Sequence, residues 1–271
     1  MPASATGQAS RTRWPTRLAR LCRLLLHVVT GWLYLKLLYP RRSREAQLDM
    51  IRDWSRRLLT ILGIAVRDAG DRPAPSMQSM LVANHISWLD IFVIHAHRPV
   101  RFVAKAEVRG WPVIGTLCSV TGTLFIERVK RKDAHRIRAM LVGALAEGDW
   151  IGVFPEGVTT YGDVVRHFHA NLLQAAIDRG IPLQPLALRY MQADGSRSTA
   201  ASYVGEQSLA ESLQLILEQV SITAEVLFLE PLPTQNRSRR ELARVAETAI
   251  ASALELPVIH TPLESAAGPP A

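Results

Sequence analysis

The chain contains 271 residues with a mass of 30.1 kDa, and its 32 Lys and Arg against 24 Asp and Glu give a formal net charge of +8. Because 48% of the residues are hydrophobic and 21% are charged, the composition excludes wholesale disorder. The two cysteines, Cys22 and Cys118, are too few for a disulfide framework or a thiolate zinc site, which is typical of a reducing compartment.

The excess positive charge belongs to the N-terminal part of the chain. Residues 1–67 carry 13 Lys and Arg against three acidic residues, a net charge of +10, and the remainder has a net charge of −2. Within this part lies the most apolar stretch, Leu24–Leu38, which arginines flank on both sides. The stretch is shorter than the roughly 20 apolar residues of a spanning helix. We therefore predict a helix that lies in or dips into the membrane interface. Four aromatic residues are the expected anchors at the level of the lipid headgroups: Trp14, Trp32, Tyr34 and Tyr39.

A second basic helix is predicted over Arg44–Leu62, where apolar residues recur at helical spacing. Its Arg52, Arg56 and Arg57 are available to lipid phosphates. A DNA-binding protein is disfavoured because the arginines bracket an apolar run and do not line a polar recognition helix. A core helix with a solvated basic face is the alternative for Leu24–Leu38. Residues 1–63 are thus predicted to be a basic, membrane-associated helical segment without a nucleic-acid partner.

From Ile64 onward, short β-rich runs alternate with helical stretches, which predicts an α/β domain with a mixed sheet flanked by helices over residues 64–256. A Ser-x-x-Glu capping box at Ser238 marks the start of the last helix. Residues 257–271 are predicted to be a disordered tail, and the first ten residues to be unstructured. The expected strands are Ile64–Arg67, Met80–Ala83, Arg101–Ala104, Thr123–Ile126, Trp150–Phe154, Leu183–Arg189 and Ile222–Leu229. The expected helices are Trp88–His97, Trp111–Val120, Asp133–Glu147, Asn171–Asp178, Ser208–Gln219 and Ser238–Leu254.

A candidate for acid–base chemistry follows the second expected strand, where the chain reads Asn-His-Ile-Ser-Trp-Leu-Asp from Asn84 to Asp90. A carboxylate five residues after His85 can fix the tautomer of the imidazole and stabilise the imidazolium. Because the chain has no Gly-x-Ser-x-Gly motif, such a base would activate a hydroxyl of the substrate itself. The alternative is structural, since Ser87 to Asp90 is also a Ser-x-x-Asp capping pattern.

Three further segments have distinctive residues at the ends of expected strands. They are Gly122–Arg128 (GTLFIER), Phe154–Gly157 (FPEG) and Ile181–Leu186 (IPLQPL). Together with Asn84–Asp90, and in this order, they resemble the four sequence blocks of the glycerolipid acyltransferase family typified by 1-acylglycerol-3-phosphate acyltransferase. Four ordered matches over about 100 residues are far more specific than any one of them.

The resemblance implies an acyltransferase with a His–Asp dyad, in which His85 is the general base and Asp90 its orienting partner. It assigns Arg128, Glu156 and Gly157 to the acceptor headgroup site. Lys105 matches another basic position that the family places near the acceptor phosphate. The acceptor hydroxyl would attack an acyl thioester directly, with acyl carrier protein or coenzyme A as the carrier and without a cofactor or a metal. The expected location is the cytoplasmic face of the inner membrane.

One departure from the family pattern bears on the acceptor. Phosphatidate-forming members usually continue the third block as Glu-Gly-Thr-Arg-Ser, whereas this chain has Thr159 in place of the arginine. The loss of a bidentate cation weakens the grip on a phosphate, and the segments at 161–168 and 203–206 look more like the branch that acylates lyso-ornithine lipid. The predicted function is therefore transfer to a lysolipid of the 1-acylglycerol-3-phosphate type, with lyso-ornithine lipid as the alternative acceptor. A non-catalytic, membrane-tethered binding module is the alternative from another class.

Two His-x-His pairs, His95/His97 and His167/His169, are candidate metal ligands. Neither pair has an obvious carboxylate or cysteine partner at a fixed spacing. The sequence therefore predicts no metal site.

Overall fold

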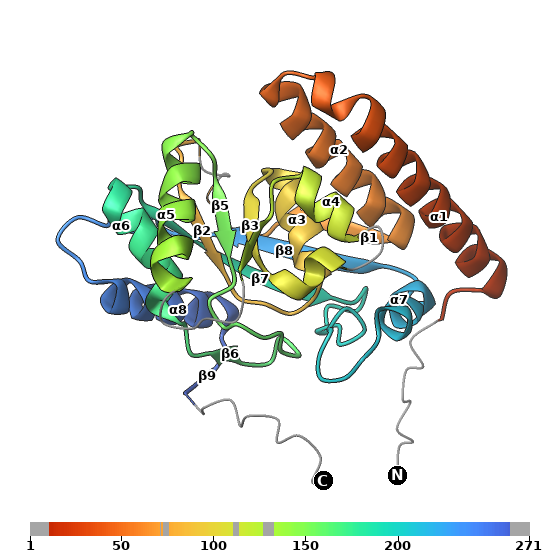
Figure 1. Cartoon of the computed structure of the whole chain (residues 1–271). Coiled ribbons are helices and arrows are strands. Elements are labelled where there is room, and N and C mark those ends of the chain that lie inside the picture. Colours follow the sequence, from red (N-terminus) through yellow and green to blue (C-terminus); the bar gives the residue numbers. More distant parts are fainter. Residues whose placement is uncertain (1–10, 71, 73–75, 111–113, 127–132, 261–271) are drawn as a thin grey trace, which may run out of the picture.

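A seven-stranded mixed sheet forms the centre of the computed structural model, which describes residues 11–70, 72, 76–110, 114–126 and 133–260 (Figure 1). The spatial order of its strands is β1-β8-β7-β2-β5-β3-β4. All neighbours are parallel except β7 and β8, which pair antiparallel, so the mixed sheet is confirmed. The strands are β1 (Ile64–Asp68), β2 (Met80–Ala83), β3 (Arg101–Lys105), β4 (Leu124–Ile126), β5 (Ile151–Val153), β7 (Leu183–Met191) and β8 (Ile222–Phe228).

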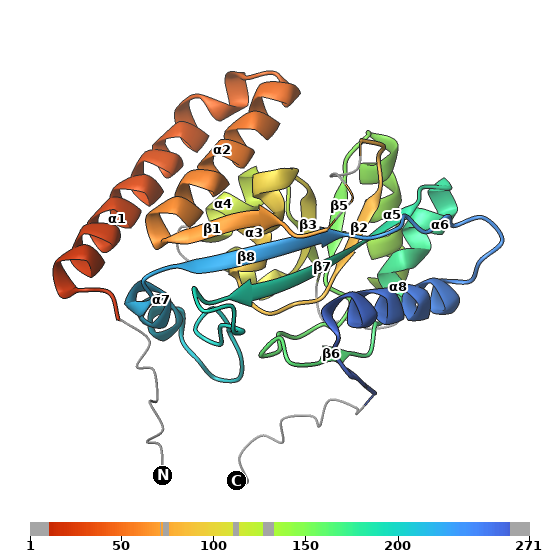
Figure 2. The ribbon, with the colours of Figure 1, turned by 180° about the vertical axis from the view of Figure 1, so that it is seen from behind.

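Helices cover both faces of the sheet, with a hydrophobic core on each side (Figures 1 and 2). Side chains alternate between the faces of a strand. In β2, accordingly, Leu81 and Ala83 belong to one core while Met80 and Val82 belong to the other. The first core contains residues of α2 (Arg44–Leu62), α3 (Leu89–His97) and α7 (Leu209–Glu218). The second contains residues of α5 (Asp133–Ala146), α6 (Gln174–Arg179) and α8 (Arg239–Leu254).

The N-terminal part is a pair of helices, α1 (Trp14–Leu37) and α2, joined by the short 3-10 helix η1 (Tyr39–Arg41). The helix predicted from Leu24 therefore begins ten residues earlier, and Pro15 occupies its first turn, where a missing N–H costs nothing. Gly63 ends α2 with φ +79°, a left-handed conformation that favours glycine. Tyr39 is buried beside Leu35 and so cannot act as the predicted headgroup anchor.

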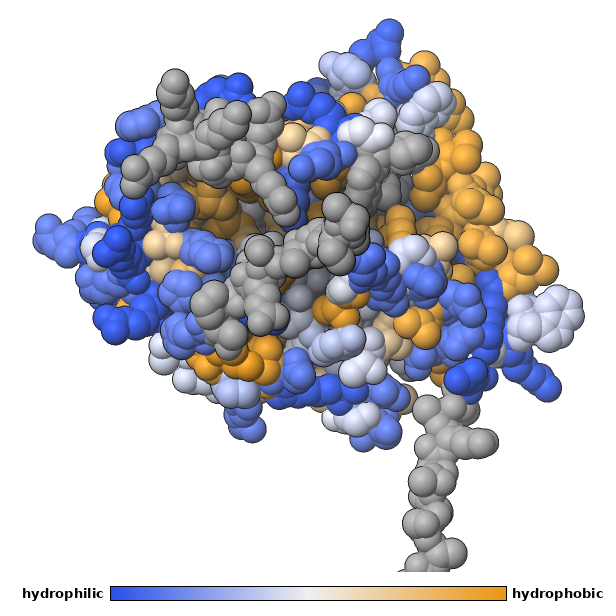
Figure 3. All heavy atoms as spheres, turned by 60° about the horizontal axis from the view of Figure 1, so that its bottom comes forward, coloured by the Kyte–Doolittle hydropathy of each residue, from blue (hydrophilic) through white to orange (hydrophobic). Residues whose placement is uncertain are grey.

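The apolar side of α1 faces outward. The stretch Trp14–Arg41 is long and apolar enough to cross a membrane, by length and composition, and only 17% of its most apolar window is buried. Figure 3 shows the resulting apolar surface over α1 at the right edge of the molecule. A buried core helix is excluded by this exposure, and the surface indicates association with a membrane. The exposed large apolar residues of α1 are Trp14, Leu18, Leu25, Leu26, Val29, Leu33, Tyr34 and Leu37.

Polar contacts fix the start of α1 to the end of α7. Arg20 donates to the backbone oxygens of Gln219 (2.8 Å) and Val220 (2.9 Å), and Arg17 pairs with Glu218 at 3.2 Å. Arg56 of α2 donates its Nε–H to the backbone oxygen of Ala96 at 2.8 Å, so this predicted lipid contact also makes a bond within the protein. The helical pair is thus anchored to the α/β domain at both helices.

Two short strands were not predicted from the sequence. β6 (Val165–Arg166) and β9 (Val258–Ile259) form a separate two-stranded parallel sheet. The expected disordered tail from Pro257 is therefore wrong for its first residues, because β9 pairs with β6; residues 261–271 lie outside the described part. At Ser238 the side chain accepts from the Glu241 N–H, one half of the predicted capping box. The shorter helices α4 (Ile114–Val120), η2 (Ala106–Gly110) and η3 (Ala170–Leu173) complete the fold.

Candidate active site

The predicted site residues follow neighbouring parallel strands at their carboxyl ends. His85 comes two residues after β2, Glu156 three residues after β5, and Lys105 is the last residue of β3. Because β2, β5 and β3 are adjacent in the sheet, these residues meet at one edge, where ligands bind in open α/β sheets. Arg128, the fourth such residue, lies outside the described residues.

His85 and Asp90 form the predicted dyad geometry. The Nδ1 atom of His85 lies 2.8 Å from Oδ2 of Asp90, and the aspartate, in the first turn of α3, is fully buried. The same Oδ2 accepts the backbone N–H groups of Ile86 (2.7 Å) and Ser87 (3.0 Å). One carboxylate oxygen thus makes the imidazole contact expected of a dyad and accepts the Ser87 N–H, as the capping pattern predicts, although Trp88 at the N-cap of α3 makes no side-chain cap hydrogen bond. The catalytic role of the pair stays a prediction.

Tyr190 completes the surroundings of Asp90 and was missed by sequence reasoning. It lies near the end of β7, is 3% exposed, and its hydroxyl donates to Oδ1 of Asp90 at 2.7 Å. Burial and the adjacent carboxylate raise the pKa of Tyr190 well above its usual range, so it stays a donor. No local pattern could have identified it, because the contact joins positions 100 residues apart.

The second ring nitrogen of His85 is available for chemistry. Its ring stacks on Phe154, with centroids 4.0 Å apart, and its side chain is 20% exposed. Since Nδ1–H donates to Asp90, the lone pair of the neutral ring lies on Nε2. Among the residues that the structure describes, Nε2 has no hydrogen-bond partner. This arrangement can accept a proton from a bound hydroxyl.

Glu156 holds the backbone of the site. It is 2% exposed; Oε1 accepts the N–H of His85 at 2.6 Å and Oε2 that of Arg166 at 2.9 Å. Burial raises the pKa of Glu156 from 4.5 to about 7, and the two backbone hydrogen bonds oppose that rise. These contacts give Glu156 a positioning role, and its assignment to the acceptor headgroup stays a prediction.

Other contacts fix the chain on either side of the dyad. The backbone oxygen of His85 accepts from the N–H of Thr160 at 2.9 Å, and that of Ile86 from Tyr203 at 2.9 Å. Thr159 donates its hydroxyl to the backbone oxygen of Tyr203. The loops at 157–164 and around 203, which the sequence linked only to the acceptor, therefore also support His85.

The remaining predicted residues are at the surface of this edge. Lys105 is exposed at the end of β3, paired in register with Ile126. Gly157 is exposed with φ +73°, which a side chain would strain. Their assignment to the acceptor site stays a prediction.

Both His-x-His pairs have carboxylate partners that the sequence did not reveal. In space, His97 Nδ1 lies 3.3 Å from Asp68 and His167 Nδ1 lies 3.3 Å from Glu247. Each acidic residue is far from its histidine along the chain, so no fixed spacing could reveal the pairs.

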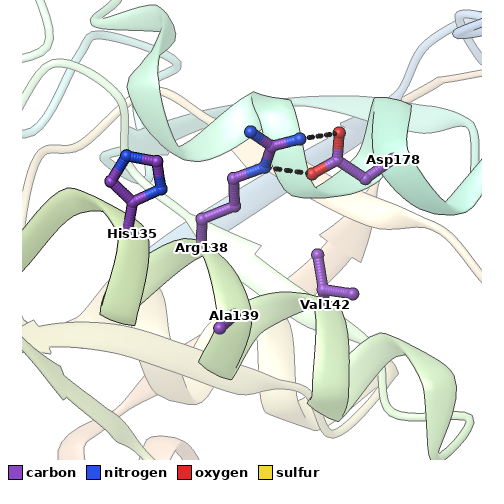
Figure 4. A pocket seen from close by; sticks show the side chains of 5 residues that line it. All are labelled: His135, Arg138, Ala139, Val142 and Asp178. Atoms are coloured by element: carbon purple, nitrogen blue, oxygen red, sulfur yellow. Dashed lines mark hydrogen bonds and ion pairs between the residues drawn. The ribbon is translucent and has the colours of Figure 1, made fainter.

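A hollow of about 430 Å³ between α5 and α6 does not belong to this site (Figure 4). It is lined by His135, Arg138, Ala139, Val142 and Asp178, and the Arg138–Asp178 ion pair, with Nη2 2.6 Å from Oδ1, spans it. None of its lining residues belongs to the dyad or its supports.

Comparisons with known proteins identify relatives of this chain. Residues 65–189 match the family model described as "Acyltransferase". The chain is 38% identical over 215 residues to a lyso-ornithine lipid O-acyltransferase of Pseudomonas aeruginosa, covering 79% of this chain and 80% of that protein. It is 36% identical over 222 residues to a 1-acyl-sn-glycerol-3-phosphate acyltransferase of Neisseria gonorrhoeae, covering 79% of this chain and 83% of that protein.

The fold also matches a solved structure. The 1-acyl-sn-glycerophosphate acyltransferase PlsC from Thermotoga maritima superimposes with a TM-score of 0.60 at 20% identity, covering 87% of this chain and 96% of that one. The chain therefore belongs to the acyltransferase family, as its four sequence blocks indicated.

Proposed function

We propose that this chain is a lysolipid O-acyltransferase that moves an acyl group from a thioester to the free hydroxyl of a lysolipid. The observation that carries the proposal is the His85–Asp90 pair, with Nδ1 bound to a buried carboxylate and Nε2 free among the described residues. The acyltransferase relatives support the same class of reaction.

In the proposed reaction, the acceptor hydroxyl attacks the carbonyl carbon of the thioester while His85 Nε2 takes the hydroxyl proton. The new C–O bond gives a tetrahedral intermediate, and Asp90 stabilises the imidazolium across the 2.8 Å contact. The intermediate then expels the thiolate as the C–S bond breaks, and the thiolate receives the proton from His85. No acyl-enzyme and no cofactor are required for this step.

Thr159 favours lyso-ornithine lipid as the acceptor over 1-acylglycerol-3-phosphate. It stands where phosphatidate-forming members carry an arginine, and its hydroxyl is used by the backbone oxygen of Tyr203. Position 159 therefore provides no positively charged group to bind a phosphate. The exposed Lys105 at the same sheet edge still suits an acidic headgroup, including the carboxylate of an amino acid. Glu156, Gly157 and Arg128 complete the proposed acceptor side by resemblance.

The exposed apolar face of α1 supports a position on the membrane that supplies the lipid acceptor. We place the enzyme on the cytoplasmic face, where acyl thioesters are made. The basic surface flanking α1 suits an acidic acyl carrier protein as the donor.

The test is an acyl-transfer assay with the purified full chain, using acyl carrier protein and coenzyme A thioesters against both acceptors. His85→Ala should abolish transfer while the melting temperature and vesicle binding stay as in the wild type. His135→Ala, at an exposed histidine of α5, is the matched control and should retain full activity. Activity of His85→Ala would refute the proposed base. Absence of transfer by the wild-type chain to any lysolipid would favour the non-catalytic binding module.

A further inference from the structure

A second cluster of chemically competent side chains lies outside the dyad, where β6, β9 and α8 meet. His167, Glu247 and His260 each offer one ligand atom, and these atoms all lie within 4.8 Å of one another. His167 Nδ1 is 3.3 Å from Glu247 Oε2, and His260 Nε2 is 3.7 Å from Glu247 Oε1. We propose that these three residues form a binding site for a divalent transition-metal ion, with Zn²⁺ as the best fit.

The backbone brings the two histidines together. β6 and β9 run parallel, with Val165 opposite Val258 and Arg166 opposite Ile259, and the N–H of His167 bonds to the oxygen of Ile259 at 3.1 Å. The next residues in this register are His167 and His260, so parallel pairing sets the two imidazoles side by side. Their ring centroids are 5.2 Å apart.

Glu247 has the properties of a built ligand. It is only 2% exposed on α8, and the backbone N–H of Phe168 donates to its Oε2 at 2.6 Å. A hydrogen bond of this kind orients a metal-binding carboxylate. Oε1 makes no hydrogen bond within the described part of the chain and lies on the side of His260. Glu247 is thus a buried carboxylate that has one oxygen without a hydrogen bond and lies beside two imidazoles. A buried carboxylate is costly unless a cation pairs with it.

The distances and ligand types indicate zinc. At Zn–N and Zn–O distances of about 2.0 to 2.2 Å, two ligand atoms of a tetrahedral site lie about 3.3 to 3.5 Å apart. The two contacts, 3.3 Å from His167 to Oε2 and 3.7 Å from His260 to Oε1, are close to this spacing, and side-chain rotation would bring both imidazoles to one oxygen of Glu247. Two histidines and one glutamate are a common donor set for zinc, whereas Mg²⁺ and Ca²⁺ prefer oxygen ligands. His167 and His260 are 55% and 62% exposed, which gives an ion access and leaves a fourth position for water.

The site adjoins the support of the dyad. Arg166, the residue before His167, donates its backbone N–H to Glu156, and Glu156 holds the N–H of His85. A bound ion would tie β9 and α8 to the segment that carries this contact. The proposed role is therefore structural, and the ion takes no part in the acyl transfer itself.

The experiment uses the full chain in detergent, stripped with a chelator and then titrated with Zn²⁺. Bound zinc is measured by elemental analysis after gel filtration. We expect one zinc per chain, a higher melting temperature with zinc, and no comparable binding of Mg²⁺. Glu247→Gln, which keeps an oxygen for the Phe168 N–H, should weaken zinc binding at least tenfold. His260→Ala should do the same at an exposed position where loss of folding is not expected.

His135→Ala serves again as the control, because it removes an exposed histidine from α5 and leaves the cluster intact. Its zinc content and thermal shift should equal those of the wild type. Absence of stoichiometric zinc in the wild type would overturn the proposal in favour of a metal-free ion-pair cluster. Equal binding by His260→Ala and the wild type would overturn it as well. Neither outcome depends on whether the chain transfers an acyl group.

Discussion

Replacing Asp90 by asparagine separates the charge of the dyad from its hydrogen-bond geometry. Oδ2 of Asp90 accepts three donors, His85 Nδ1 and the N–H groups of Ile86 and Ser87. Oδ1 faces one donor, the hydroxyl of Tyr190. An asparagine can keep its carbonyl oxygen at the position that faces three donors. Its amide N–H group would then donate to the hydroxyl oxygen of Tyr190, whose hydrogen can rotate away. The fold and the tautomer of His85 are therefore retained, and only the negative charge is lost.

The magnitude follows from Coulomb's law. The imidazolium and the carboxylate are in contact at 2.8 Å, which puts their centres of charge about 4 Å apart. At an effective dielectric constant of about 20, the attraction is about 4 kcal/mol, or roughly a thousandfold in rate if the proton is fully transferred in the transition state. Partial transfer gives less, so we expect kcat to fall between about tenfold and a thousandfold for Asp90→Asn.

The assay is initial-rate acyl transfer, with thiol release as the signal, together with the melting temperature of the same preparation. Asp90→Ala is the matched comparison, because it removes the acceptor from four donors, three of them in buried contacts, and should lower stability strongly. An Asp90→Asn enzyme with the wild-type kcat and a lowered melting temperature would contradict a catalytic role for the carboxylate charge. Asp90 would then be a helix cap only.

Three further predictions concern groups around and away from the dyad. Tyr190→Phe leaves Oδ1 of Asp90 without its donor and should cost about 1.5 to 3 kcal/mol in urea unfolding, with a reduced kcat; unchanged values of both would contradict it. The raised pKa of Glu156, about 7 against 4.5 unfolded, means that its stabilising contribution is full below pH 4.5 and is lost as pH rises through 7. The wild type should therefore lose about 3 kcal/mol relative to Glu156→Gln between pH 5 and 8 in denaturant titrations, and parallel curves would exclude this. Leu26→Asp on the exposed face of α1 should weaken binding to anionic vesicles at least tenfold in sedimentation. Ala210→Asp, at an exposed position of α7, is the matched control and should bind these vesicles as the wild type does.

Much of the fold could be predicted because the strands are short, mostly apolar runs that alternate with helical stretches. β2 matches its predicted bounds, Met80–Ala83, and β3, β5 and β8 differ from theirs by one or two residues. The pairing of His85 with Asp90 could also be predicted, since the two residues lie within or next to one strand-to-helix connection. Sequence order did not reveal that β5 lies between β2 and β3, the arrangement that puts Glu156 beside His85.

Elements defined by long-range pairing could not be predicted. β6 and β9 have two residues each, too few for an alternating pattern, and their pairing joins Val165 to Val258 across the chain. The carboxylate partner of His167, Glu247, is likewise far away along the chain, so no local pattern could reveal it. The early start of α1 was missed because its first turns are polar and arginine-rich, so the apolar run alone placed the boundary at Leu24.

The dyad motif is local, but distant segments determine its geometry. Glu156 holds the N–H of His85, Thr160 holds its backbone oxygen, and Tyr190 holds the far oxygen of Asp90. These contacts come from three loops or strands at separations of 71 to 100 residues. A His-x-x-x-x-Asp sequence alone can occur in any chain, whereas in this chain these contacts also fix the position of the proposed base. The block containing Glu156 thus contributes to the geometry of the pair, because its glutamate holds the backbone from which His85 projects.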